Sequence, residues 1–205
     1  RQIVERLILA TAEFSNRAQF GQIPESIAEG FPLAMRISRY YGDIAEHAEA
    51  IAKLEADLPA PPDPAIAEAL TEFRRETSNV LDLSDPDNED FAMKRLKHAI
   101  RDFADDYQAL KALLLRAGAD DRMPVRQMVA RLDELSYVRR MIDQAYKAAK
   151  YTRRLRKQLH HYRDGDQTPP ERAETETYDD DAVMQMTDLP GRTAEAKDAP
   201  SGKTD

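Results

Sequence analysis

The feature that most constrains the fold of this chain is a set of long stripes of apolar residues, spaced three or four positions apart. This spacing has the period of an α-helix, so the side chains of one stripe share a helix face that needs a covering partner. The clearest stripe stops at the proline-rich segment "PAPPDP" (59–64), because proline lacks the N–H that a helix requires. The stripe consists of Leu33, Ile37, Tyr41, Ile44, Ala48, Ile51 and Leu58.

Further stripes predict four more helices. The segment "GQIPESIAEGFP" (21–32) contains two glycines and two prolines, and we expect it to interrupt the chain between the first helix and the second. In "SDPDNED", the residues Ser84, Asp85 and Asn88 are natural caps, and Gly118 is a natural helix end. Short connections between long helices predict an all-α fold, an elongated antiparallel helical bundle. The four stripes lie within residues 1–20, 66–81, 91–114 and 128–159.

The charge distribution divides the chain into a body and a tail. Residues 163–205 contain 12 acidic and 5 basic residues, whereas residues 1–162 contain 26 acidic and 25 basic ones. The tail is also poor in apolar residues, so we expect 163–205 to be a disordered acidic segment. We assign 31–162 to the helical bundle and 1–30 to an N-terminal helix or connector.

Several kinds of chemistry have no signature in the sequence. The chain has no cysteine, and it contains no glycine-rich phosphate loop, no HExxH or ExxH metal motif and no GxSxG elbow. We therefore expect a protein that is not an enzyme. No apolar run reaches the roughly 20 residues of a membrane span. Because the chain starts at Arg1 rather than at methionine, we expect an excised fragment whose parent protein has a membrane portion elsewhere.

An internal similarity appears when the chain is shifted by 97 positions. The segment "YYGDIAEHAEAIAK" (40–53) then lies on "YVRRMIDQAYKAAK" (137–150), and both segments belong to long predicted helices. This predicts a duplicated architecture, with two three-helix units. The coinciding pairs are Tyr40 with Tyr137, Ala48 with Ala145, Ala52 with Ala149, Lys53 with Lys150, and the acids Glu46 with Asp143.

These segments resemble the PhoU-like domains, which are tandem three-helix bundles of phosphate regulation. "DIAEHAEAIA" looks like the family's ERIGDHAxxIA helix motif, and "RRMIDQAYKAA" looks like its second copy. Over about residues 33–155, the chain is most similar to the C-terminal region of bacterial sodium-dependent phosphate cotransporters. The resemblance implies a soluble cytoplasmic regulatory or anchoring domain at the inner membrane. Its implied partners are the membrane-embedded transporter portion and a second copy in a homodimer.

The resemblance also raises the question of metal binding. PhoU proteins bind iron or zinc through E/DxxxD motifs, in which acids at i and i+4 share one helix face. Here the downstream acids Glu46 and Asp143 are kept, but Gly42 and Arg139 stand where the upstream acids belong. We expect no resident cofactor, with iron or zinc as the alternative. Two other local pairs could hold a metal or could be solvated surface groups: Asp43 with His47, and Asp102 with Asp106.

The last predicted helix has a one-sided basic stripe. No acidic residue follows Asp143 up to residue 163, and on a helical wheel the bases lie opposite the apolar side. The stripe could be a solvated helix end, a contact with an anionic membrane surface or acidic partner, or a nucleic-acid contact, which the near-neutral body disfavours. Besides the transporter domain, two functions therefore stay open: a stand-alone helical interaction module and a surface metal-binding sensor. The stripe consists of Lys147, Lys150, Arg153, Arg154 and Lys157.

Overall fold

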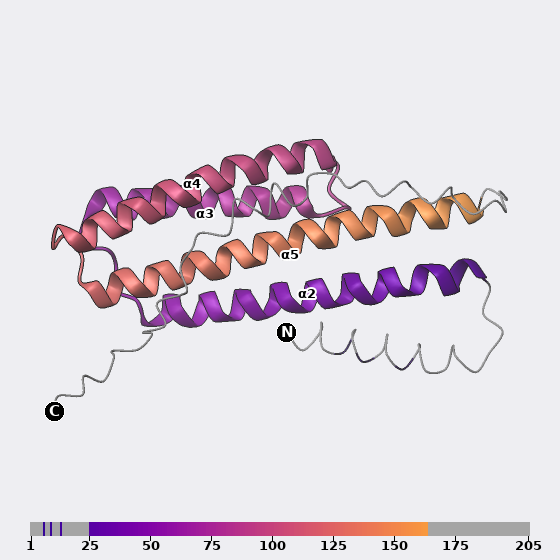
Figure 1. The fold of residues 1–205 in the computed structure, drawn as a ribbon, viewed down its shortest axis with the longest axis horizontal. Helices are drawn as coiled ribbons and strands as arrows, with labels where there is room; N and C mark the ends of the chain where they lie inside the picture. Colours follow the sequence, from indigo (N-terminus) through magenta and orange to yellow (C-terminus); the bar gives the residue numbers. More distant parts are fainter. Residues whose placement is uncertain (1–5, 7–8, 10–12, 14–24, 164–205) are drawn as a thin grey trace, which may run out of the picture. The chain divides into compact units, whose positions relative to one another are not determined.

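The computed structural model describes residues 6, 9, 13 and 25–163, which belong to one compact unit (Figure 1). The predicted first helix lies almost wholly outside these residues, although Arg6, Leu9 and Glu13 are helical. The predicted acidic tail, apart from residue 163, also lies outside them. Within the described part of the chain there are four helices and no strand, which confirms the all-α bundle. The helices are α2 (Glu25–Asp57), α3 (Pro64–Ser84), α4 (Met93–Ala119) and α5 (Val125–Arg163).

Helix α2 begins earlier than the sequence predicts. Residues 25–32 were expected to interrupt the chain, but they form the first turns of α2 with Pro32 inside the helix. Proline here lacks one backbone hydrogen bond, yet tertiary packing continues across it. Leu33 is buried, and a Cβ added at Gly30 would lie only 3.1 Å from Leu155 Cδ1. Contact with α5 therefore extends past the proline and stabilises the helix on both sides of it.

The connections between the helices use local caps. Asp63 caps the start of α3, where its carboxylate accepts a hydrogen bond from the Ala65 N–H at 2.9 Å. After α3, Asp85 accepts from the Asp87 N–H at 2.9 Å and Asn88 accepts from the Asp90 N–H at 2.8 Å. The predicted turn at "SDPDNED" is therefore built by the side chains that the sequence marked for it.

Gly118 has a different role from the predicted helix end. Helix α4 continues through it to Ala119, and the residue with a left-handed backbone is Asp121, with φ 57°. A Cβ added at Gly118 would lie 2.2 Å from Met128 Sδ. Glycine is therefore needed here because α4 and α5 approach closely, and the turn itself is made by aspartate, which tolerates this conformation better than most residues.

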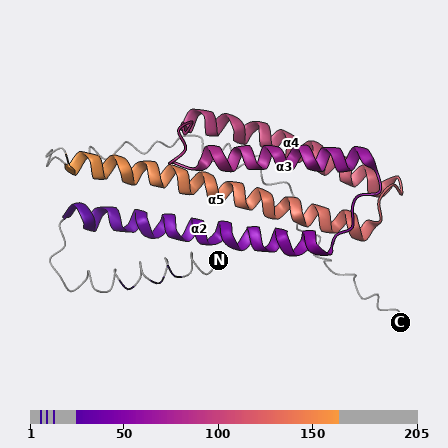
Figure 2. The same ribbon diagram turned by 180° about the vertical axis from the view of Figure 1, so that it is seen from behind.

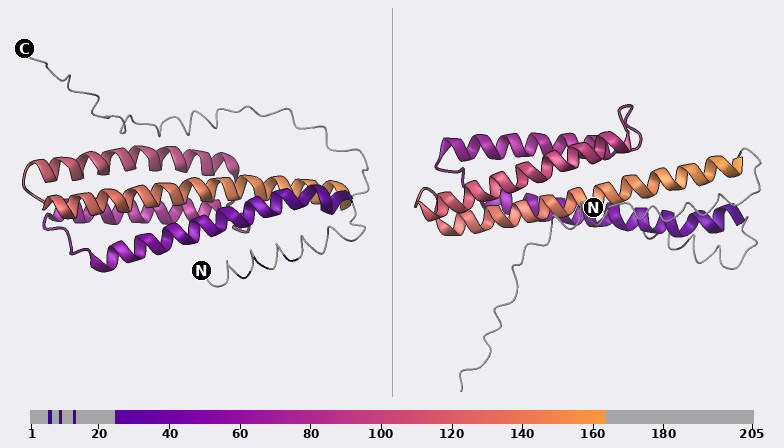
Figure 3. Two further views of the ribbon diagram at one scale, coloured as in Figure 1. Left: turned by 60° about the horizontal axis from the view of Figure 1, so that its bottom comes forward. Right: turned by 45° about the horizontal axis from the view of Figure 1, so that its top comes forward.

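Helices α2 and α5 form the longest pairing in the bundle (Figure 1, Figure 2). They run antiparallel, and the rings of His47 and Tyr137 lie 6.0 Å apart between centroids. Helices α3 and α4 form a hairpin that packs on α5 (Figure 3). The two similar segments, 40–53 and 137–150, are thus neighbours in one four-helix bundle. In the described residues they do not build two separate three-helix units.

The core forms where the α3–α4 hairpin covers α5. Phe73 and Phe103 join the two hairpin helices, with ring centroids 5.2 Å apart. Along α5, Ala145, Ala148 and Ala149 are all buried, so their small side chains allow the surrounding helices to approach closely. The largest fully buried side chains are Ile66, Val80, Leu96, Leu114, Met123 and Leu135.

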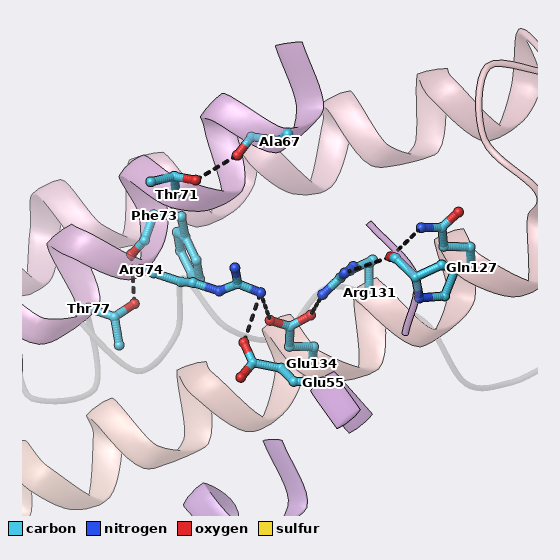
Figure 4. A network of polar contacts seen from close by, with 10 residues as sticks. Glu55, Ala67, Thr71, Phe73, Arg74, Thr77, Gln127, Arg131 and Glu134 are labelled. Carbon is cyan, nitrogen blue, oxygen red and sulfur yellow. Dashed lines mark hydrogen bonds and ion pairs between the residues drawn. The ribbon is translucent and has the colours of Figure 1, made fainter. Parts of the chain in front are cut away.

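A buried ionic network lies within this apolar core (Figure 4). Glu134 of α5 is only 3% exposed, and its two oxygens lie 2.6 Å from Arg131 Nη1 and 3.2 Å from Arg74 Nη2. Arg74 also lies 2.8 Å from Glu55, so one carboxylate links α5, α3 and the end of α2. Arg131 and Glu134 are buried, and burying a charge is costly unless it keeps its partner. Arg74 and Glu55 are exposed, so they form the solvent side of the network and extend it to α3 and α2.

The same network holds the proline-rich connector between α2 and α3. Arg131 Nη2 donates to the Pro59 carbonyl at 3.2 Å, and Gln127 Nε2 donates to that carbonyl at 2.9 Å. Two carbonyls of the connector thus receive side-chain donors, since Gln127 also reaches the Ala60 carbonyl at 3.3 Å. The connector is fixed by α5 rather than by its own prolines alone.

Removing the shared carboxylate should destabilise the bundle strongly. We expect Glu134→Ala to lower the free energy of unfolding by about 3–5 kcal/mol, because Arg131 would remain buried without its carboxylate, while Arg74 would keep only Glu55. Urea denaturation followed by circular dichroism measures this. The matched control is Glu68→Ala on the exposed side of α3, which should change stability by less than about 0.5 kcal/mol. Equal effects of the two variants would contradict the role given to Glu134.

Candidate functional site

The basic residues predicted as a stripe lie at the end of α5. Lys150, Arg153, Arg154 and Lys157 are exposed, and we call these four residues the basic face. Lys147, the fifth predicted residue, is half-buried and donates to Asp143 Oδ2 at 2.8 Å. Lys147 therefore has an internal ion pair one helical turn before the basic face.

The α3–α4 hairpin ends before α5 does, which leaves the end of α5 paired with α2 (Figure 1). Arg156 marks the border, because it donates to the Pro86 carbonyl at 2.7 Å and contacts Asp87 in the α3–α4 loop. Arg156 is three positions from Arg153, so it lies at the edge of the basic face, on the side toward the α3–α4 loop. Past this border Leu159, which lies on the apolar side of α5 and not on the basic face, is 48% exposed.

Helix α2 brings a further cation and an aromatic pair to this region. Tyr40 and Tyr151 pack with ring centroids 5.6 Å apart, and Arg36 Nη1 donates to the Tyr151 hydroxyl at 3.3 Å. Burial raises the pKa of Tyr40, the neighbouring Tyr151 adds to that rise, and Lys147 and Arg36 oppose it. The pattern of α2 alone did not predict this cluster, since it depends on which residues of α2 and α5 face each other.

The first group of predicted metal ligands does not converge. Glu46 is exposed, Asp143 is paired with Lys147, and His47 packs its ring on Tyr137. Asp43 is half-buried on α2. In the part of the chain that the structure describes, no group of three or more histidine, aspartate or glutamate side chains is arranged to hold a metal ion.

The second predicted pair, Asp102 and Asp106, belongs to an acidic cluster on the hairpin. Asp102 lies 3.8 Å from His98 Nε2. Burial raises the pKa of Asp106, and the neighbouring carboxylates Glu76 and Asp102 raise it further. This crowding of like charges shows that no cation of the described chain neutralises Asp106 fully. Besides Asp102 and Asp106, the cluster contains Glu72, Glu76 and Asp105.

Comparisons with known proteins add no assignment. The chain matches no known protein-family model, and neither a curated protein nor a solved structure is significantly similar to it. Among residues 25–163, no helix has the length and apolar character needed to cross a membrane. The geometry of α2 and α5 therefore has to support any functional proposal.

Neutralising the crowded carboxylate should stabilise the fold at neutral pH. The folded state has a raised pKa at Asp106, so its charged form costs stability above that pKa, and the cost disappears as the pH falls through it. We expect Asp106→Asn to raise the melting temperature at pH 7 and to leave it nearly unchanged at about pH 3, below the ordinary aspartate pKa. Asp133→Asn, exposed on α5, is the control. A larger gain at low pH than at pH 7 would contradict this origin.

Proposed function

We propose that this chain is a PhoU-like regulatory or anchoring domain of a bacterial sodium-dependent phosphate cotransporter-like protein. It acts at the cytoplasmic side of the inner membrane, where the basic face contacts anionic lipid headgroups beside the transport segments. It performs no catalysis. Support comes from the PhoU-like motifs in α2 and α5, and from the position of the basic face at the uncovered end of α5.

The observation that carries the proposal is the segregation of charge. The basic face has four exposed cations, and no acid follows Asp143 in the rest of α5. Near an anionic leaflet, each such cation gains about 1 kcal/mol, so four together suffice for reversible association. The macrodipole favours cations at a helix end as well, but it acts only within the last turn and does not select one side of the helix.

A lipid surface fits this charge pattern better than a nucleic acid does. Duplex binding usually requires a wide basic field, whereas the α3–α4 hairpin has the acidic cluster around Asp106 and the acidic loop 85–90. The acidic loop lies against Arg156, so a membrane surface has to meet α5 on the side away from that loop, where the basic face is exposed. The exposed Leu159 adds apolar area that can enter the headgroup region, as in helices that lie at a membrane interface.

Reversing two charges of the basic face should strongly weaken binding to anionic vesicles. We expect Arg153→Glu with Arg154→Glu to lower the partition coefficient on phosphatidylcholine vesicles containing phosphatidylglycerol by at least about tenfold. Cosedimentation at physiological salt measures it, and circular dichroism should show unchanged helix content, since both side chains are exposed.

The control variant makes the same change of net charge on another surface. Arg116 near the end of α4 and Arg126 at the start of α5 are exposed at the opposite end of the bundle, so Arg116→Glu with Arg126→Glu also reverses two cations. This variant should bind vesicles within about twofold of the unaltered chain, because screened charges far from the contact have little effect. If both variants lose vesicle binding equally, or if Arg153→Glu with Arg154→Glu loses none, the proposal is contradicted. The basic face is then only a solvated helix surface.

A further inference from the structure

We propose that Arg36, Tyr40, Lys147 and Tyr151 form a binding site for a single phosphate group in the seam between α2 and α5. The site deepens the proposed function, because it lies one turn from the basic face. The site depends on the proposed membrane function when the phosphate group belongs to a lipid headgroup. Binding of free phosphate does not depend on that function.

The four side chains come from both helices and converge on one place. Arg36 donates to the Tyr151 hydroxyl at 3.3 Å, and its guanidinium carbon lies 5.6 Å from the centre of the Tyr151 ring. Tyr40 packs against the same ring at 5.6 Å between centroids, and Lys147 lies four positions before Tyr151 on α5, so the two share one face of that helix. One turn of α2 and one turn of α5 therefore direct their polar groups at a shared spot.

These groups have more donors than the chain uses. A guanidinium has five N–H donors, an ammonium has three, and each tyrosine hydroxyl has one. The described contacts take one donor of Arg36, for Tyr151, and one donor of Lys147, for Asp143. Burial raises the pKa of Tyr40 and its hydrogen bond with Tyr151 raises it further, so the Tyr40 hydroxyl serves as a partner of Tyr151. The unused donors are those of Arg36, Lys147 and the Tyr151 hydroxyl.

The local charge favours an anion. Arg36 and Lys147 are two cations, and Asp143 is the carboxylate that lies 2.8 Å from one of them, which leaves one net positive charge. Lys147, Tyr40 and Tyr151 are half-buried, so water screens the attraction less than at the exposed basic face.

The donor arrangement selects a tetrahedral oxyanion over a carboxylate. A carboxylate is planar and is satisfied by one bidentate partner, whereas a phosphate group presents oxygens in several directions. Donors from two helices, at the ends of side chains of different length, can reach such oxygens from different sides. The arginine fork can match two of the oxygens, and the ammonium of Lys147 and the hydroxyl of Tyr151 offer donors to the others.

Tyrosine-selective NMR tests the site directly on the full chain. The protein has eight tyrosines, and ring-labelled tyrosine reports each one separately. On titration with inorganic phosphate at constant ionic strength, we expect saturable shifts of the Tyr40 and Tyr151 ring signals, while the buried Tyr107 and Tyr146 keep theirs. Chloride at the same ionic strength should cause no such shifts.

Variants assign the shifts to the proposed contacts. Arg36→Gln should weaken phosphate binding by about tenfold or more, and Tyr151→Phe by about threefold to tenfold, as expected for a charged and a neutral hydrogen bond. Arg39→Gln is the matched control, because Arg39 is exposed on the same helix, three residues further on, and its loss should change binding by less than about twofold.

Vesicles then identify the source of the phosphate group. Phosphatidic acid exposes a phosphomonoester, so at matched surface charge the chain should prefer it to phosphatidylglycerol, and Arg36→Gln should remove that preference. This result would make a lipid headgroup the source. Phosphate-dependent tyrosine shifts without a preference for phosphatidic acid would make free phosphate the source, and they would still support the site.

The site and the proposed function fail in different ways. Absence of phosphate-dependent shifts at Tyr40 and Tyr151, or equal effects of Arg36→Gln and Arg39→Gln, would overturn the site whatever the vesicles show. Loss of the proposed function would instead appear as vesicle binding that is insensitive to Arg153→Glu with Arg154→Glu. Those two substitutions should leave the tyrosine shifts intact, because neither residue is part of the cluster.

Discussion

The carboxylate of Glu134 is the contact on which the arrangement of the helices depends. It lies in a nearly water-free place between Arg131 and Arg74, and Arg74 in turn reaches Glu55 at the end of α2. Apolar stripes alone would allow α2 to slide along α5 by a turn with little loss of buried area. Arg131, which Glu134 holds in place, and Gln127 both donate to the Pro59 carbonyl just after α2, so a shift of α2 along α5 would leave these buried donors without that acceptor. The register that results brings Tyr40 beside Tyr151 and leaves the end of α5 without cover from the hairpin.

The proposed contact surface follows from the unequal lengths of the two helix pairs. At this end the α3–α4 hairpin stops at its loop, where Arg156 donates to the Pro86 carbonyl. Helix α5 continues beyond the loop to Arg163, beside the first turns of α2. The part of α5 that the hairpin covers contains Ala145, Ala148 and Ala149, which are buried and whose small side chains allow close packing. Beyond the loop the same helix needs apolar residues only toward α2, so its other side can hold cations. The acidic cluster around Asp106 stays on the hairpin, which separates the two signs of charge within one bundle.

The sequence predicted the helical class and most helix boundaries, because apolar spacing and proline are local signals. It failed at Pro32 and Gly118, where packing against α5 decides the outcome: Gly30 accommodates Leu155, and Gly118 accommodates Met128. Helical periodicity placed four of the five predicted basic residues on an exposed side of α5, but it did not predict that Lys147 is half-buried and paired with Asp143. The buried Arg131 and Glu134 were overlooked, although charges three positions apart on an apolar face are a readable signal. The contact of Tyr40 with Tyr151 could not be predicted from the sequence, because these residues are 111 positions apart and meet only through the register of α2 and α5.

The central claim is that the basic end of α5 meets an anionic membrane surface, and the absence of cysteine makes a site-specific measurement simple. A single cysteine at Leu159, labelled with a polarity-sensitive fluorophore, reports whether this position enters the headgroup region. Leu115 on α4 is a matched reference, since it is 45% exposed against 48% for Leu159 and lies on the hairpin. On addition of phosphatidylglycerol vesicles, the account predicts a blue-shifted emission at position 159 and none at 115. Equal shifts at both positions, or no shift at 159, would contradict it.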